Sequence, residues 1–241
     1  MKDLQIDTTP LGLLNSDSYG VDLGCKSSAP AVATFKGTIG SRSSYLELRS
    51  TPLKEEADIS FTFRTIQPDT LLLLSTFQGQ TPGSGMGARS FAGKETHFYS
   101  VAIVGGLLEA RFNGGAGETP LISESRVNDG KYHTVTLSKR HRRVSMSLDD
   151  SETGASRLAK GTRDIEAPTE GGLYLGGCPK RITLRGMAGT KESLKGIIRD
   201  LVINKKPIKF NEPVGFEHVN IGRESFVGNE VTEPEYFLER T

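Results

Sequence analysis

Alternating apolar and polar residues recur in short segments along the chain, and this pattern predicts β-strands. Residues 58–64 place Ile59, Phe61 and Phe63 on one face and polar side chains on the other, which is the period of two of a half-buried strand. The same alternation appears in residues 133–138 and again in 144–148. Residues 71–74 are apolar at every position, as expected of a strand that is covered on both faces.

Tight turns separate these segments. Phe98–Val104 and Leu107–Phe112 are joined by Gly105-Gly106, a pair that suits a two-residue hairpin turn. Further short strands are expected at residues 32–35, 45–48, 173–175, 198–203 and 208–210. Many short strands with turns between them predict an all-β fold, an antiparallel β-sandwich with jelly-roll-type connections.

Composition narrows the functional classes. The 30 Lys and Arg residues nearly balance the 29 Asp and Glu residues, so any electrostatic attraction must come from a local cluster. Tryptophan is absent, which excludes a tryptophan-lined sugar platform. No apolar run approaches the roughly 18 residues that span a bilayer. No apolar region follows Met1 as in a signal peptide, so the chain is either cytosolic or a piece of a longer secreted chain.

The strongest local charge is the basic run at the predicted tip between residues 133–138 and 144–148. It comprises Lys139, Arg140, Arg142 and Arg143, with His141 among them. Arginine grips sulfate groups with two donors, so the run is a candidate site for heparan sulfate or another acidic partner. The alternative is a charged turn that keeps a strand edge soluble. Nucleic acid is not expected, because the interleaved aromatic residues of single-strand binders are missing.

Other basic residues could extend this positive tip. They are Lys180, Arg181, Arg185, Lys205, Lys206 and Lys209.

The order of several motifs resembles laminin G-like domains, which have a concanavalin-like jelly roll. The motifs lie at Phe61–Thr65, Pro68–Leu74, Phe112–Gly115, Asn128–His133, Tyr174–Gly177 and Gly196–Asn204. The entry from Leu13 to Cys25 and the segment from Phe210 to Val219 are most similar to the second such module of laminin α chains. The resemblance implies an entry segment at 1–25, a sandwich at 26–226 and a linker toward a following module at 227–241.

The two cysteines, Cys25 and Cys178, have two interpretations. Members of the family often place a cysteine after the glycine of the closing strand, but here Ile197 holds that position. A bridge between Cys25 and Cys178 would close a long loop, worth on the order of 5 kcal/mol in the chain-entropy model. The alternative is a pair of reduced thiols, because spacing alone does not show proximity.

Calcium is the metal that the resemblance brings into question, since Ca²⁺ needs six or more oxygen ligands. The positions that match the family's ligands are His97 and a point near Pro168, and neither supplies a side-chain oxygen. Glu95, Glu166 or Glu170 could substitute with a shift of register. We therefore expect no cofactor and no metal, with calcium as the lesser alternative.

Catalysis is not expected. Glycoside hydrolases on such sandwiches need two facing carboxylates, but Asp149 and Asp150 are consecutive and point to opposite faces of a strand. They more readily end a strand and open a turn. His133 has no neighbouring Ser or Cys nucleophile in the sequence, so it is interpreted as a core or sheet-face histidine.

The resemblance implies a noncatalytic adhesion module of a secreted basement-membrane protein. Its expected partners are an integrin or another cell-surface receptor, heparan sulfate, neighbouring laminin G-like modules and other laminin chains. The alternative is a lectin-like module of the same architecture that binds uncharged glycans at a concave, aromatic site.

Overall fold

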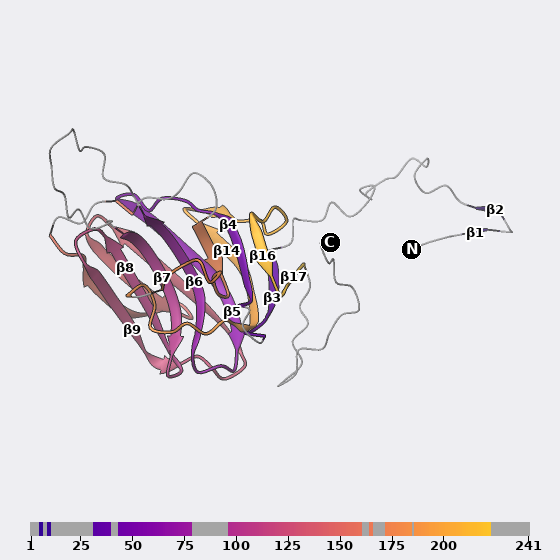
Figure 1. Cartoon of the computed structure of the whole chain (residues 1–241), viewed down its shortest axis with the longest axis horizontal. Helices are drawn as coiled ribbons and strands as arrows, with labels where there is room; N and C mark the ends of the chain where they lie inside the picture. The colour runs from indigo at the N-terminus through magenta and orange to yellow at the C-terminus, as the bar shows by residue number, and fades with distance from the viewer. Residues whose placement is uncertain are drawn as a thin grey trace.

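The computed structural model shows two facing antiparallel sheets (Figure 1) and describes residues 5–6, 9–10, 31–39, 43–78, 96–160, 164–165, 172–184 and 186–222. Ahead of the sandwich, β1 (Gln5–Ile6) pairs with β2 (Thr9–Pro10). The secondary structure of the described residues is entirely strand, turn and loop. Among them there is accordingly no helix of the length and apolarity needed to cross a membrane.

One sheet has eight strands. In spatial order they are β12 (Ser151–Arg157), β11 (Arg143–Leu148), β10 (Tyr132–Arg140), β5 (Glu56–Thr65), β14 (Lys195–Ile203), β3 (Val32–Lys36) and β17 (Val219–Ile221), with β15 (Lys206–Pro207) paired to β14. The alternation in β5 and β10 sets their register, in which Phe61 lies opposite Val135. Both side chains are buried, and this register directs the apolar side of each strand into the sandwich.

The other sheet has seven strands. In spatial order they are β16 (Gly215–Glu217), β4 (Tyr45–Arg49), β13 (Gly172–Leu175), β6 (Thr70–Gln78), β7 (Thr96–Val104), β8 (Leu107–Gly114) and β9 (Glu118–Arg126). Gly105 and Gly106 form the predicted turn between β7 and β8, with φ of 59° and 85°. Positive φ at both positions is what a two-residue hairpin turn requires.

The main hydrophobic core lies between the sheets. It contains Phe35, Phe61, Phe63 and Phe112 together with aliphatic side chains from both sheets. Gly176, directly after β13, has φ of 68°, and a Cβ there would lie 2.3 Å from the Phe35 ring. The close approach of this backbone to the aromatic core therefore requires glycine.

The outer face of the seven-stranded sheet is covered by the described residues of the segment 178–188, which follows β13. Leu184 and Met187 pack with Leu74, Phe98 and Ala102 in a second hydrophobic cluster. The Ser100 hydroxyl donates a hydrogen bond to the Met187 carbonyl and fixes the segment on the sheet. This cover explains why the predicted strand at 71–74 is apolar on both faces.

The outer face of the eight-stranded sheet is polar. The Thr62 and Thr134 hydroxyl oxygens lie 2.9 Å apart, and Thr136 donates to Ser60 at 3.3 Å. Ser138 donates to Asp58 at 2.7 Å. Hydroxyl pairs of this kind satisfy one another across strands, so this face needs no covering layer.

The all-β antiparallel sandwich predicted from the sequence is confirmed. The expected strand at 208–210 is wrong, because these residues follow β15 as irregular chain. The sandwich strands run from β3 to β17, within the expected boundaries of 26 and 226. Those boundaries stay predictions, since residues 11–30 and 223–241 lie outside the described part.

Candidate functional site

The basic tip is a hairpin turn in the eight-stranded sheet. Arg140 ends β10 and lies opposite Arg143, the first residue of β11. His141 and Arg142 form the two-residue turn, and His141 has a φ of 52°. Both turn residues and both flanking arginines are exposed, as the sequence predicts.

Lys139 does not share this exposed surface, although the sequence analysis grouped it with the tip. It lies on the same side of β10 as Val135 and Leu137, and only 3% of its surface is exposed. Its ammonium group donates a hydrogen bond to the Lys54 carbonyl and lies 3.6 Å from an Asp164 carboxylate oxygen. The alternation of the strand directs this cation inward, where it joins β10 to two loops.

Arg140 is exposed but already paired. Its guanidinium donates to Asp58 at 2.9 Å and to the Lys139 carbonyl at 2.9 Å. The hydrogen bond from Arg140 holds the pKa of the Asp58 carboxyl below its usual value. His141 lies 3.5 Å from a Glu55 carboxylate oxygen. Glu55, just before β5, and Asp58, within it, therefore neutralise one side of the tip.

The other side of the tip keeps its positive charge. Arg143 lies directly opposite Arg157 of β12, and the Arg142 carbonyl accepts a hydrogen bond from Leu158 N at 2.7 Å. Arg142, Arg143 and Arg157 are exposed and together form what we call the arginine edge. Glu152 lies 3.7 Å from Arg143, whereas Arg142 and Arg157 have no ion pair within the described residues.

Sequence reasoning missed Arg157, which lies fourteen positions beyond the tip along the chain. A register shift between Met146 and Ser147 aligns β12 with β11 so that Arg157 lies opposite Arg143. A bulge of this kind moves one strand by a residue relative to its partner. No local sequence signal places Arg157 there, because the shift depends on the pairing of two strands.

The basic residues expected to extend the tip separate into different regions. Lys205 follows Asn204, which bonds the Asp58 backbone, and its charge contributes to the lowering of the pKa of the Asp58 carboxyl. It therefore lies on the neutralised side of the tip. Lys180 and Arg181 instead lie in the segment after β13 that covers the seven-stranded sheet, where Arg181 is 2.6 Å from Glu47. Arg185 lies outside the described residues.

Of the residues considered for calcium binding, only His97 lies in the described part of the chain. His97 is buried, and its Nδ1 lies 3.1 Å from the Asp164 carbonyl oxygen. Glu95, Glu166, Pro168 and Glu170 lie outside the described residues. In the part of the chain that is described, no three His, Cys, Asp or Glu side chains gather as a metal site would need.

The predicted disulfide also stays a prediction. Cys178 is buried in the second hydrophobic cluster, and burial raises the pKa of its thiol to about 11. It forms no disulfide with any described residue. Its expected partner, Cys25, lies outside them.

The acidic pair Asp149-Asp150 forms a turn, as the sequence analysis expects, with φ of 49° and 66°. Asp149 accepts a hydrogen bond from Thr134 N at 2.8 Å and lies 2.7 Å from His133 Nδ1. Asp129 lies 3.0 Å from His133 Nε2. Burial alone would lower the pKa of His133, but the two carboxylates outweigh it and raise that pKa. This cluster joins two turns of the sheet.

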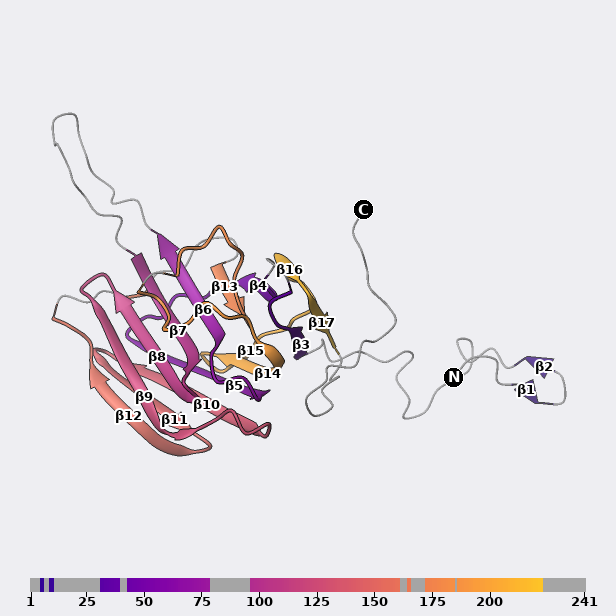
Figure 2. The same ribbon diagram turned by 60° about the horizontal axis from the view of Figure 1, so that its bottom comes forward.

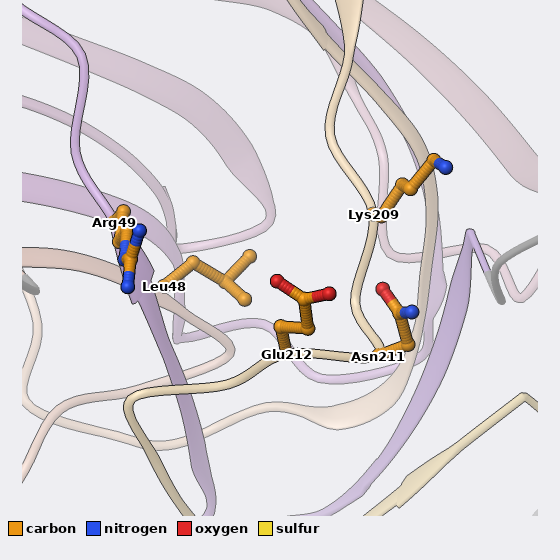
Figure 3. Close-up of a pocket in the computed structure, with 5 residues that line it drawn as sticks. All are labelled: Leu48, Arg49, Lys209, Asn211 and Glu212. Atoms are coloured by element: carbon orange, nitrogen blue, oxygen red, sulfur yellow. The ribbon is translucent and has the colours of Figure 1, made fainter.

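A shallow hollow of about 160 Å³ lies at the end of β4 (Figure 3). Its lining residues are Leu48, Arg49, Lys209, Asn211 and Glu212. None is aromatic, whereas the lectin alternative requires rings on which a sugar can stack. This hollow therefore lacks the stacking surface that the lectin alternative requires.

Comparison with known proteins agrees with this architecture. The family model "Laminin G domain" matches residues 63–209. Human laminin subunit alpha-1 is 28% identical over 231 residues, which cover 92% of this chain and 7% of that protein. Rat neurexin-2 is 31% identical over 175 residues, which cover 69% of this chain and 10% of that protein. The chain thus spans a small part of each relative.

Solved structures show the same fold. Domains LG4-5 of the mouse laminin alpha1 chain align with a TM-score of 0.63 at 20% identity, over 83% of this chain and 48% of that one. The LG1-3 region of the laminin alpha2 chain aligns with a TM-score of 0.63 at 20% identity, over 90% and 38%. The likeness to the second module in particular stays a prediction. The family match and the shared sandwich together show that this chain belongs to the laminin G domain family.

Proposed function

We propose that the chain is a noncatalytic extracellular adhesion module that binds sulfated glycosaminoglycans, such as heparan sulfate, through the arginine edge. The observation that carries the proposal is the placement of Arg143 directly opposite Arg157, next to Arg142 in the turn. Like charges at facing positions of a sheet destabilise it. A bound polyanion would remove that repulsion and receive bidentate hydrogen bonds from each guanidinium.

The charge of the remaining molecule supports a local site. The formal net charge is +1, so no general attraction draws the chain to polyanions. Arg140 is partly neutralised by Asp58, and Lys139 is buried. The arginine edge therefore carries most of the charge that a sulfated chain can reach at this hairpin.

Heparin-affinity chromatography tests the proposal. Replacing Arg142, Arg143 and Arg157 with Ala should lower the salt concentration at which the protein elutes, since interactions between exposed charges are screened by salt. The matched control replaces exposed Lys131, Lys180 and Lys191 with Ala, which changes the net charge equally.

Arg140→Ala should have a smaller effect on the elution salt than Arg143→Ala. Equal elution of the arginine-edge and control variants would favour the alternative, in which the charges only protect a strand edge.

The family match supports an extracellular location, and laminin relatives support the basement membrane as the site of action. We extend the proposal to an integrin or another cell-surface receptor as a second partner, with avidity from neighbouring laminin G modules and other laminin chains. Receptor binding by this module alone should be compared with binding by the module together with its tandem neighbours. Equal affinity would show that the neighbours add nothing.

A further inference from the structure

The hollow at the end of β4 lies far from the arginine edge. Leu48 and Arg49, the last residues of β4, form one wall, and the segment 209–212 forms the other. β4 lies beside β16 at one side of the sandwich, whereas β11 and β12 lie at the opposite side (Figure 2). A ligand in the hollow would therefore leave the arginine edge accessible to a polyanion.

The segment that forms the second wall is anchored at both ends. Phe210 is fully buried in the main hydrophobic core. Val214 N donates a hydrogen bond to the Glu47 carbonyl of β4 at 2.8 Å. These two contacts hold the segment 209–212 against β4 in the absence of any ligand. The hollow is therefore formed in advance, as binding sites for small molecules usually are.

Polar side chains of both signs surround an apolar floor in this hollow. The floor is Leu48, of which 2% is exposed. The Glu212 carboxylate points toward it, with Arg49 on one side and Asn211 on the other (Figure 3). Lys209 lines the rim, and its ammonium group points outward. Within the described residues, these four polar side chains form no hydrogen bond or ion pair, so their donors and acceptors are available to a ligand.

The charges around the hollow select the charge of the ligand. Arg49 and Lys209 are cations and Glu212 is an anion, so the hollow has an excess of one positive charge. A ligand with a single negative charge neutralises this excess. A phosphate carries up to about two negative charges near neutral pH and would be repelled by Glu212. A zwitterion would leave the positive charge unbalanced.

The remaining groups require neutral hydrogen-bond donors on the ligand. The Glu212 carboxylate only accepts hydrogen bonds, whereas the Asn211 amide both donates and accepts them. The volume of about 160 Å³ is below the roughly 300–1,000 Å³ of drug-sized sites, so the ligand is one small unit.

A sugar acid meets these requirements, because it combines one carboxylate with several hydroxyl groups. We propose that the hollow binds a single sugar acid, a ligand distinct from the sulfated chain on the arginine edge. The guanidinium of Arg49 holds the carboxylate with two parallel hydrogen bonds, and Glu212 and Asn211 bind the hydroxyl groups. Binding by charge and hydrogen bonds needs no aromatic ring.

An NMR titration of the whole chain tests this assignment. Glucuronate or N-acetylneuraminate should shift the Leu48 methyl and Arg49 Nε–H signals, with saturation in the millimolar range because a shallow hollow buries little of the ligand. Glucose, the neutral control, should bind about tenfold more weakly, since it lacks the charged partner of Arg49. The acid that binds more tightly identifies the source as a uronate unit or a sialic acid. Equal binding of glucose, or no shift with either acid, would overturn the proposal.

Substitutions separate the roles of the two charged walls. Arg49→Gln should weaken glucuronate binding about tenfold, whereas Lys206→Gln, an equal change of charge outside the hollow, should have little effect. Glu212→Gln removes the repelling charge and should strengthen the binding of inorganic phosphate several-fold. Unchanged methyl signals of the core residue Val135 show that each variant is folded.

Two results of these titrations would also overturn the proposal. One is equal glucuronate affinity in the Arg49→Gln and unaltered chains. The other is phosphate binding to the unaltered chain as tightly as glucuronate. Replacing the three residues of the arginine edge with Ala should leave glucuronate binding unchanged, so failure of heparin binding and failure of sugar-acid binding are distinguishable.

Discussion

The outer faces of the two sheets are stabilised in different ways. The seven-stranded sheet carries apolar residues on its outer face and covers them with the segment 178–188. The eight-stranded sheet carries short hydroxyl side chains that bond one another and stay at the surface. We infer that stability is concentrated under the covered face, whereas the polar face is free to present charges such as the arginine edge.

The sharpest test of this difference removes Glu47, a buried carboxylate of the covered face. Glu47 accepts hydrogen bonds from Tyr174 Oη at 3.0 Å and Arg181 Nη2 at 2.6 Å. Glu47→Ala should lower the free energy of unfolding by about 3 kcal/mol, since it leaves buried polar groups without a partner. The expected loss is not larger, because the Arg181 side chain is 61% exposed and solvent screens its charge. Urea unfolding measures this loss of free energy, and the control variant is Glu152→Ala on the eight-stranded sheet.

Removing apolar contact from the cover should have the next largest effect. Met187 is buried in the second hydrophobic cluster, so Met187→Ala should cost about 2 kcal/mol in urea unfolding. Ile122 of β9 is 52% exposed, and Ile122→Ala should change stability by less than about 0.5 kcal/mol. Equal costs for the two variants would contradict the idea that the segment 178–188 stabilises the fold.

The two sheets should also respond to different pH ranges. The folded-state pKa of His133 is raised by Asp149 and Asp129. Its contribution is therefore complete below the unfolded pKa of about 6.5 and is lost as pH rises through the folded value. We expect a loss of about 0.5 kcal/mol, because both carboxylates are solvated. His133→Gln should remove this pH dependence from urea unfolding.

The covered face should instead respond at high pH. Burial, aided by Glu47, raises the pKa of Tyr174 to about 12. The contribution of the neutral hydroxyl is complete below about pH 10 and is lost as pH rises toward the folded value. Tyr174→Phe should flatten the stability profile above pH 10 without altering the step that His133 causes near neutrality.

The smallest effect should come from the hydroxyl pair on the polar face. Replacing both Thr62 and Thr134 with Val removes both partners of one hydrogen bond and leaves neither unsatisfied. Such double replacements are nearly neutral, so unfolding should change by less than about 0.5 kcal/mol. A loss as large as that of Met187→Ala would show that the polar ladder stabilises the sheet as strongly as the cover does.

The strands rich in large apolar residues were predictable from sequence, and those with few such residues were not. β5, β10 and β11 show a period of two in large apolar residues, and each is found close to its expected bounds. β9 was missed because its buried positions include the short polar residues Thr119 and Ser123. β12 is rich in small and charged residues, and β16 and β17 have three residues each. Pairing with neighbours forms these strands.

Only the part of the candidate site that lies within one hairpin was predictable from the sequence. The hairpin tip follows from two alternating segments with a short turn between them. The inward direction of Lys139 follows from the same alternation, and the error came from grouping the basic residues by charge alone. Arg157 required knowledge of the bulge in the β11–β12 pairing, which depends on contacts across strands.

The pairing of β3 with β17 decides how the domain responds to tension. The start of β3 and the end of β17 lie at the same end of this antiparallel pair, where Gly222 N bonds the Val32 carbonyl. A force transmitted along the polypeptide would therefore peel the two strands apart one hydrogen bond at a time, instead of shearing them all at once. Mechanical load would open this corner first and leave the distant arginine hairpin intact.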